Sequence, residues 1–257
     1  MTIKFSIVTV VLNDLRGIRA THLSLLRQRN KNYEWIVKDG GSVDGTKEFL
    51  ESLAEDFKLI SGKDSGIYDA MNLCVQYAKN DFVVFMNAGD IFYDEDVLSN
   101  VESSILNGDE EGDILFGGAI LRFPRANIDF YRTPRKSATC LWHGLPANHQ
   151  ATYYRRSLLE KCPYDLKYSL CGDYYLDVKF IELGAIEKYL NRPLAIFEVG
   201  GESYKRLSQL FIEPYYIQRD VLRSPFYLRI ASAIKRLVST LAFIVLSQPL
   251  LNKKADK

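Results

Sequence analysis

The chain has 257 residues, which is enough for one large α/β domain or two small ones. Hydrophobic residues make up 47% of it and charged residues 25%, so the composition excludes a disordered, collagen-like or low-complexity protein. Its four cysteines form no CxxC pair, which argues against a zinc site or a disulfide framework and fits a reducing compartment.

The net charge of +1 combines two unequal parts of the chain. From Val221 onward seven basic residues stand against one acid, so this tail carries +6 and residues 1–220 carry −5. An acidic body favours an enzyme that uses a metal cation, and a basic tail indicates an anionic partner. The N-terminus lacks a secretory signal pattern, and the run Leu237–Leu251 is too short and interrupted to span a bilayer. We therefore expect a cytoplasmic protein.

Strand and helix patterns alternate over the first hundred residues. A continuous apolar, β-branched run predicts a strand at Phe5–Val11, and further strands are predicted at Tyr33–Lys38, Phe57–Ile60 and Phe82–Met86. Apolar residues at helical spacing predict helices at Gly17–Arg27, Asp44–Leu53 and Gly66–Ala78, the second with Ser42 as its N-cap. These βαβ units predict a mostly parallel sheet with helices on both faces.

The pattern is looser after residue 100. We expect paired strands at Ile114–Phe123 and Ile128–Arg132, a loop over Pro134–Pro146, and a return to the sheet at His149–Tyr154. A helix near Asp173–Leu183, strands near Ile186–Leu190 and Leu194–Val199, and two helical stretches from Leu207 onward follow. Because the chain shows no internal repeat and no flexible linker, we predict one continuous domain with a C-terminal helical extension.

Polar residues follow each of the first four predicted strands. They are Asn13 and Asp14, Asp39, Asp64, and Asn87 with Asp90. In open parallel sheets, ligands bind beyond the carboxyl ends of the strands, so these side chains are the first candidates for a site. A carboxylate in this place can hold a cation that bridges a diphosphate, although Asn87–Asp90 taken alone is also an ordinary turn. The glycine-rich patterns of Rossmann dehydrogenases and P-loop enzymes are absent from the sequence.

Four segments in this order resemble the motifs of family 2 glycosyltransferases with the GT-A fold. They are Ser6–Asn13, Trp35–Thr46, Asp64–Asn72 and Phe85–Asp90, and the resemblance continues through His149-Gln150, Cys171–Tyr174 and Gly200–Ser203. The GIYDAMN and NAGD forms resemble bacterial enzymes of exopolysaccharide and O-antigen assembly, including the WcaE-like colanic acid transferases. The resemblance implies a GT-A domain over residues 1–204, with nucleotide-sugar binding in 1–100 and acceptor binding in 101–204. Residues 205–257 form the helical extension.

The resemblance also implies which residues contact the donor, a UDP- or GDP-linked sugar. Thr9 and Asp39 would hold the base and ribose, and Asp64 would line the same pocket. The remaining candidates are Val11, Asn13, Tyr68, Asn72, Asn87, Ala88 and Lys205. Structural alternatives remain open, because Asp39 suits an Asx turn and polar residues suit a helix start at Tyr68 and Asn72. The turn Gly200–Ser203, with Lys205 and Arg206, is a candidate lid or a plain turn before a helix.

The metal motif of the family is reduced in this chain, since Asn87-Ala88-Gly89-Asp90 replaces the usual DxD pattern. The resemblance implies that Asp90 ligates Mn²⁺ or Mg²⁺ together with diphosphate oxygens and water. His149 is a further ligand, a phosphate contact, or a polar residue that closes a strand. Asp173 matches the family's catalytic base, which removes the proton from the acceptor hydroxyl, and a helix N-cap is its structural alternative.

We therefore expect a metal-dependent, inverting glycosyltransferase that transfers a hexosyl or deoxyhexosyl group to a saccharide acceptor. The acceptor would be lipid-linked, for example through undecaprenyl diphosphate, in bacterial surface polysaccharide assembly, and no nucleic acid is involved. An inactive nucleotide-sugar-binding homologue is an alternative because the metal motif is reduced. A nucleotidyltransferase is a weaker alternative. Such an enzyme would carry a glycine-rich basic loop after the first strand, and this sequence does not supply one.

The tail from Tyr227 to Val245 repeats apolar residues at helical spacing, with basic residues largely on the other side. A basic amphipathic helix of this kind can lie in the headgroup region of an anionic membrane. It would hold the enzyme peripherally on the cytoplasmic face of the inner membrane. Packing on its own domain, or on a second subunit of a homodimer, is the alternative.

Overall fold

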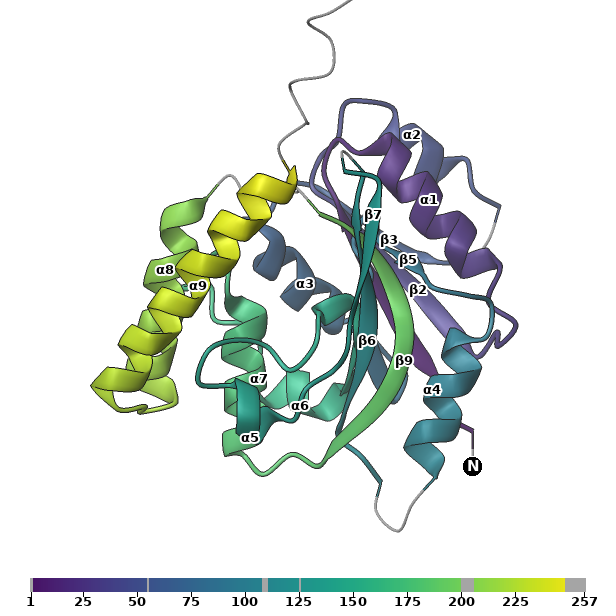
Figure 1. Ribbon diagram of the computed structural model, residues 1–257. Coiled ribbons are helices and arrows are strands. Elements are labelled where there is room, and N and C mark those ends of the chain that lie inside the picture. Colours follow the sequence, from purple (N-terminus) through teal and green to yellow (C-terminus); the bar gives the residue numbers. More distant parts are fainter. Residues whose placement is uncertain (1, 55, 108–110, 125, 200–205, 248–257) are drawn as a thin grey trace, which may run out of the picture.

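The computed structural model describes residues 2–54, 56–107, 111–124, 126–199 and 206–247. One curled sheet runs through the molecule and separates two layers of helices (Figure 1). The strand order is β3-β2-β1-β4-β8-β6-β9-β5, and β7 pairs with β6 outside this path. This is the α/β fold that the sequence predicts.

The first half of the sheet is parallel, as expected. Its strands are β1 (Phe5–Val11), β2 (Tyr33–Asp39), β3 (Lys58–Ser61) and β4 (Phe82–Phe85), connected by α1 (Leu15–Leu26), α2 (Thr46–Glu51) and α3 (Ile67–Val75). The register pairs Val11 with Asp39 and Asp39 with Ser61. The carboxyl ends of β1, β2 and β3 are therefore level, and the loops that follow them emerge along one edge of the sheet.

The second half of the sheet mixes directions. It contains β5 (Ile91–Phe92), β6 (Ile114–Phe123), β7 (Ile128–Arg132), β8 (Thr152–Arg155) and β9 (Glu187–Glu198). Strand β8 is antiparallel to both β4 and β6, whereas β9 runs parallel to β6. The two strands expected near Ile186–Leu190 and Leu194–Val199 are one strand, β9, whose register with β6 shifts at Gly117 and Gly118. A Cβ at Gly117 would lie 2.1 Å from the Leu194 side chain, so only glycine allows this close passage.

The helices pack on the sheet in two layers with separate cores. Helices α1, α2 and α4 (Val97–Leu106) bury Ile18, Leu50 and Val101 against one face. Helices α3, α6 (Arg156–Lys161) and α7 (Gly172–Glu182) bury Met71 and Phe180 against the other. The continuous apolar runs of β1 and β4 follow from this arrangement, because a strand covered on both sides buries every side chain.

Local differences from the sequence expectations lie at helix ends. Helix α2 begins at Thr46 behind Gly45, whose φ is +96°, and Ser42 does not cap it. The Ser42 hydroxyl instead accepts the backbone N–H of Asn13 at 2.8 Å. The expected loop Pro134–Pro146 contains a short helix, α5 (Ser137–Cys140), and the 3₁₀ turn η1 (His149–Ala151) precedes β8.

The C-terminal helices pack against α7 on one side of the molecule (Figure 1). They are α8 (Leu207–Tyr216), the π-helix η3 (Ile217–Val221) and α9 (Phe226–Ser247). Ile217 is fully buried beside Tyr168, Tyr174 and Val178 in a third apolar cluster. Within the described ranges, the helices are all too short or too polar to cross a membrane.

Helix α9 turns its polar side toward its own domain. Ser232 is buried and accepts a hydrogen bond from Gln218 at 2.8 Å, and Arg236 donates to the carbonyl oxygen of His143 at 3.3 Å. The opposite side of the helix carries exposed apolar side chains, those of Tyr227, Ile230, Ile234, Leu237, Val238 and Leu241, which we call the apolar face. The alternative in which the tail packs on its own domain is therefore confirmed for one side of α9, and contact of the other side with a membrane stays a prediction.

Candidate active site

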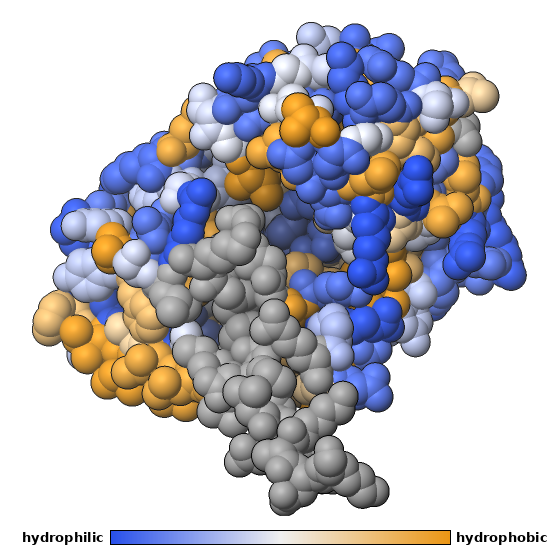
Figure 2. All heavy atoms as spheres, turned by 90° about the horizontal axis from the view of Figure 1, so that it is seen from above, coloured by the Kyte–Doolittle hydropathy of each residue, from blue (hydrophilic) through white to orange (hydrophobic). Residues whose placement is uncertain are grey.

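A cavity of about 670 Å³ opens at the carboxyl ends of the parallel strands. Seen from above in Figure 2, it lies in the hollow of this face. Its wall combines the end of β1, the start of α3, the turn after β4, the segment Asn148–Gln150 and the start of α7. Segments far apart in sequence therefore meet where the sequence predicts a ligand site.

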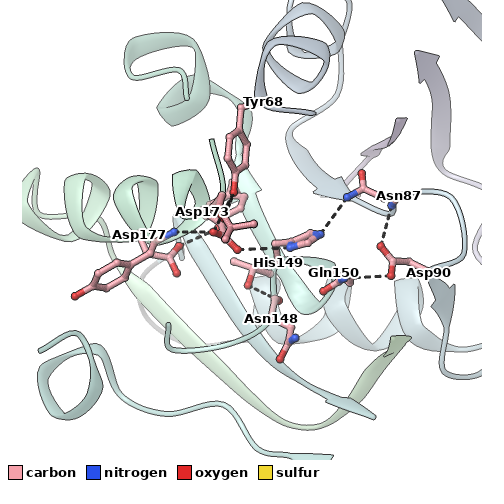
Figure 3. A network of polar contacts seen from close by, with 12 residues as sticks. Tyr68, Asn87, Asp90, Asn148, His149, Gln150, Asp173 and Asp177 are labelled. Atoms are coloured by element: carbon pink, nitrogen blue, oxygen red, sulfur yellow. Dashed lines mark hydrogen bonds and ion pairs between the residues drawn. The ribbon is translucent and has the colours of Figure 1, made fainter. Parts of the chain in front are cut away.

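A chain of polar contacts crosses this site and joins Asp173 to Asp90 (Figure 3). Oδ2 of Asp173 lies 3.6 Å from Nδ1 of His149, and Nε2 of His149 lies 3.3 Å from the side-chain nitrogen of Asn87. The Asn87 backbone N–H then donates to Oδ2 of Asp90 at 3.0 Å. Gln150 completes the chain by donating to Oδ1 of Asp90 at 3.1 Å. One connected network thus links the predicted base to the predicted metal ligand.

Burial sets the protonation of this network. Burial raises the pKa of Asp90 to about 7, against the lowering effects of His149 and of the hydrogen bonds from Gln150 and Asn87. Burial alone would lower the pKa of His149, but the carboxylates of Asp173 and Asp90 outweigh it and raise that pKa above 6.5. The neighbouring carboxylates therefore favour the protonated form of His149, whereas burial favours the neutral form of Asp90.

The turn that carries Asp90 is fixed by α1. The buried hydroxyl of Thr21 donates to the carbonyl oxygen of Asp90 at 2.8 Å and accepts the N–H of Gly89 at 3.0 Å. Gly89 has a φ of +94°, which favours glycine. A Cβ at Gly17 would lie 2.8 Å from the Gly89 nitrogen, so α1 meets this turn at backbone contact distance.

The oxygen atoms around Asp90 fit a hard divalent cation. Among the described residues, no group of three His, Cys, Asp or Glu side chains is placed to bind a metal. However, Oδ1 of Asn87 and Oε1 of Gln150 are buried without a hydrogen-bond partner among these residues. Carboxylate and amide oxygens are ligands that Mg²⁺ and Mn²⁺ accept. Each carboxylate oxygen of Asp90 accepts one of these hydrogen bonds and keeps a second lone pair that a cation can use.

Asp173 stands in the first turn of α7 and lines the cavity. The N-cap position belongs to Cys171, so the helix-cap alternative for Asp173 is wrong. Its Oδ1 accepts the backbone N–H of Tyr174 at 3.0 Å and lies 3.4 Å from the Tyr68 hydroxyl. Tyr68 in turn stacks on Tyr164 with 4.7 Å between ring centroids. The carboxylate is thus held at the cavity wall while its Oδ2 faces His149.

The donor-side candidates divide into two groups. Val11, Asp64, Tyr68, Asn87 and Ala88 line the cavity. Four others lie outside the lining formed by the described residues, namely Thr9, Asn13, Asp39 and Asn72. Lys205 and the turn Gly200–Ser203 fall outside the described residues.

Each of the four candidates outside the lining has a structural contact. Thr9 is buried and accepts a hydrogen bond from the Trp35 ring at 2.9 Å. The carboxylate of Asp39 accepts the Ser42 N–H at 3.0 Å in the Asx turn that the sequence left open. Asn13 and Asn72 accept backbone N–H groups, those of Val43 and Tyr164 respectively. These side chains therefore shape the loops around the cavity.

Lys38 is a buried residue that the sequence patterns did not single out. Only 2% of its side chain is exposed, and its ammonium donates to Oδ2 of Asp64 at 3.1 Å. The same group donates to the carbonyl oxygens of Asp39 and Gly62. Lys38 thereby ties the loops after β2 and β3 together and fixes Asp64 at the cavity. The sequence patterns also did not identify Gln150 as a site residue, although the motif His149-Gln150 contains it.

Residues 6–161 match the sequence profile of Glycosyl transferase family 2. The chain belongs to this family. Among curated relatives, a PGL/p-HBAD biosynthesis glycosyltransferase of Mycobacterium tuberculosis is 28% identical over 243 residues, which cover 90% of each chain. An uncharacterized glycosyltransferase of the same bacterium is 31% identical over 173 residues, 65% of each chain.

Solved structures confirm the GT-A fold of this family 2 glycosyltransferase. A mannosyltransferase from Pyrobaculum calidifontis, in complex with GDP-Man and Mn²⁺, has a TM-score of 0.70 and 16% identity. The similarity covers 98% of this chain and 77% of that one. TarS from S. aureus in complex with UDP has a TM-score of 0.64 and 17% identity, over 98% of this chain and 76% of that one.

Proposed function

We propose that this family 2 glycosyltransferase transfers a sugar from a nucleoside-diphosphate sugar to a hydroxyl group of a saccharide acceptor, with inversion at the anomeric carbon. The observation that carries the proposal is the connected network from Asp173 to Asp90 at one cavity. It supplies a carboxylate for proton removal at one end and oxygen ligands for a cation at the other. Both requirements of glycosyl transfer are met by residues that line or border a single cavity.

In the proposed reaction the acceptor oxygen bonds to the anomeric carbon as the bond from that carbon to the diphosphate breaks. Asp173 takes the proton of the acceptor hydroxyl, because a sugar hydroxyl is a weak nucleophile while it keeps that proton. The electron pair of the broken bond leaves with the nucleoside diphosphate. A single displacement of this kind inverts the anomeric configuration. His149 and Tyr68 hold the Asp173 carboxylate through the contacts described above.

We assign the cation site to oxygen atoms of Asp90, Asn87 and Gln150. A bound Mn²⁺ or Mg²⁺ would supply positive charge that stabilises the leaving diphosphate. His149 has both ring nitrogens directed at other side chains, so we assign it to positioning Asp173 and Asn87 rather than to metal ligation. The Mn²⁺ and GDP-Man bound to the Pyrobaculum mannosyltransferase support a cation in a fold of this kind.

The donor is a UDP- or GDP-linked sugar in this proposal. Structural neighbours bind UDP, UDP-GlcNAc and GDP-Man, which supports both bases. Asp64 and Val11 at the cavity would contact the nucleotide, with Thr9 and Asp39 shaping the base pocket from behind. A hexosyl or deoxyhexosyl group would then lie between the Asn87–Asp90 turn and Asp173.

We further propose that the acceptor is lipid-linked and that the enzyme binds the membrane surface peripherally through the apolar face of α9. Six large apolar side chains on one side of one helix make a continuous exposed stripe. Figure 2 shows hydrophobic side chains gathered on the side of the molecule where α8 and α9 lie. The sequence after α9 adds Lys253, Lys254 and Lys257 against one acid, Asp256, and an anionic lipid surface would attract this charge, whereas a second copy of the tail would repel it. Surface polysaccharide assembly on the cytoplasmic face of the membrane fits such an arrangement.

The transfer reaction can be tested with a panel of UDP- and GDP-linked sugars, MnCl₂ and octyl glycosides as acceptors. We expect nucleoside diphosphate release with one donor and a glycoside of inverted anomeric configuration, read from the NMR coupling of its anomeric proton. Retention of configuration would contradict the single displacement. Tight binding of a nucleotide sugar without any turnover would instead assign the chain to inactive sugar-binding homologues.

Membrane binding can be tested by flotation with vesicles that contain phosphatidylglycerol. We expect the chain to float with anionic vesicles, and Ile234→Gln combined with Val238→Gln to reduce the floated fraction severalfold. Leu23→Gln is the matched control, because Leu23 is equally exposed but lies on α1. Equal flotation of all three proteins would contradict the role of the apolar face. A concentration-dependent dimer that the double variant abolishes would identify a second copy as the partner.

A further inference from the structure

Glu213 of α8 forms an unusually complete set of hydrogen bonds with the segment just before α7. Its Oε1 accepts the backbone N–H of Ser169 at 2.9 Å and the Ser169 hydroxyl at 2.8 Å. Its Oε2 accepts the N–H groups of Leu170 and Cys171 at 3.0 and 2.8 Å. Glu213 is buried. One carboxylate from the C-terminal helices therefore binds three consecutive peptide units that end two residues before Asp173.

The same segment is held from the opposite side by Tyr68. The Tyr68 hydroxyl donates to the carbonyl oxygen of Leu170 at 2.6 Å. A Cβ at Gly172 would lie 2.8 Å from the Tyr68 ring, so the first turn of α7 rests directly on this ring. The start of α7 is thus fixed between an aromatic residue of the donor half and a carboxylate of α8.

A second polar connection joins α7 to the C-terminal helices. The side-chain amide of Gln218, which is buried, donates to the Tyr174 hydroxyl at 3.3 Å and to the Ser232 hydroxyl at 2.8 Å. Tyr174 follows Asp173 directly, and its own hydroxyl donates to the carbonyl oxygen of Leu141. The segment Ser169–Cys171 before Asp173 and the residue directly after it, Tyr174, are consequently both bound to the C-terminal helices.

We propose that Glu213 is a positioning residue that sets the location of the Asp173 carboxylate, which makes the C-terminal helices part of the catalytic apparatus. This inference rests on the proposed role of Asp173 as the base. Glu213 lies outside the cavity lining formed by the described residues, so it acts on transfer through the segment Ser169–Cys171. The helices that carry the apolar face on their outer side thereby hold the base on their inner side.

The variant Glu213→Gln tests this role with little change in volume. An amide supplies one oxygen where the carboxylate supplies two, so at least one of the three backbone N–H groups loses its acceptor. Displacement of a catalytic group by about 1 Å can lower the rate about 100-fold. We expect kcat to fall by about 10- to 100-fold, with the dissociation constants of UDP and GDP in the presence of MnCl₂ changed less than twofold.

Two controls separate positioning from loss of folded protein. Asp220→Asn removes an exposed carboxylate of the same C-terminal helices that bonds only its neighbour Arg219 among the contacts of the described residues, and should keep wild-type kcat. Nucleotide-binding stoichiometry reports the folded fraction of each variant.

The variant Ser169→Ala provides a second test if Glu213→Gln does not fold. It removes a single hydrogen bond to Glu213, so kcat should fall, but by less than in Glu213→Gln. Hydrogen exchange of amides 169–171 should be faster in both Glu213→Gln and Ser169→Ala.

The outcomes distinguish this inference from the proposed function. Loss of transfer in Asp173→Asn together with a low kcat and normal nucleotide binding in Glu213→Gln supports the positioning role. Loss of transfer in Asp173→Asn with wild-type kcat in Glu213→Gln overturns the positioning role alone. Wild-type transfer in Asp173→Asn overturns the base assignment and the positioning role with it.

Discussion

Nδ1 of His149 lies 3.6 Å from Oδ2 of Asp173, while the other ring nitrogen faces Asn87 at 3.3 Å. One imidazole therefore connects the start of α7 to the turn that carries Asp90. Asp173 and Asn87 are 86 positions apart in the chain, and His149 is the residue that brings their side chains into one network.

His149→Leu should lower kcat because it removes both contacts while roughly keeping the side-chain volume. Loss of a residue that orients a catalytic group typically costs about 10- to 100-fold. Steady-state kinetics with the preferred donor measures this, and nucleotide affinity should change little. His143→Leu is the control, because His143 lies against Lys235 and outside the cavity lining. Equal rates in the two variants would contradict the connecting role of His149.

Gln150→Leu and Asp90→Asn should both weaken Mn²⁺ binding. We expect the half-saturating MnCl₂ concentration for nucleotide binding to rise about 10- to 100-fold, more for Asp90 because it is the carboxylate. Calorimetric titration of UDP or GDP at several MnCl₂ concentrations gives this value. An unchanged Mn²⁺ requirement in both variants would contradict a cation site at Asp90 and Gln150.

Thr21→Val should destabilise the protein by about 1–3 kcal/mol, because it removes a buried hydroxyl that pairs with the Asp90 carbonyl and the Gly89 N–H. Thr21→Ser keeps the hydroxyl and serves as the matched control, with a smaller loss from the missing methyl group. Urea unfolding measures both. If valine and serine cost the same, the hydroxyl does not hold the turn.

Asp177→Asn should change how stability depends on pH. Burial raises the pKa of Asp177 well above 3.8, and the charge of Asp173 adds to this, so the folded state keeps the proton. The unfolded chain loses that proton above about pH 4, so unfolding becomes easier as the pH rises toward the folded pKa. Asparagine cannot ionise, so the variant avoids this loss. Its free energy of unfolding should rise relative to that of the wild type by at most about 1.4 kcal/mol per pH unit.

Urea unfolding of wild-type protein and Asp177→Asn at pH 4.5 and 7.5 tests this sign. We expect the variant to gain stability relative to the wild type between the two pH values, while keeping the hydrogen bond from Tyr154. Glu182→Gln on the exposed end of the same helix should show no such gain. A relative loss for Asp177→Asn at pH 7.5 would contradict a protonated Asp177.

The parallel half of the fold could be predicted because its signals are local. Each strand is a short run rich in apolar residues and each connection contains a helix, so β1, β2 and β4 agree with the expectation to within one residue. That β9 is one strand could not be predicted, because its continuity depends on Gly117 and Gly118 of a partner strand some 70 residues earlier. The start of helix α2 differs from the expectation because Asp39 and Asn13, and not Ser42 alone, determine the conformation of the loop before it.

The site was predictable where it follows strand ends and less so where it depends on distant partners. Asp64, Asn87 and Asp173 meet at the cavity as their positions after strands and before a helix suggest. Lys38, Thr21 and Glu213 carry no such signal, because an isolated lysine, threonine or glutamate looks like a surface residue. Glu213 binds a segment 42 to 44 positions away, and only the fold brings the two together.

The assignment of Asp173 as the base is tested most directly by one comparison. Nucleoside diphosphate release in the presence of acceptor and the dissociation constant of the nucleotide are measured for wild-type protein and Asp173→Asn. We predict that release falls by about 10²- to 10⁴-fold while nucleotide affinity stays within twofold. Release within threefold of the wild-type rate in Asp173→Asn would contradict the account.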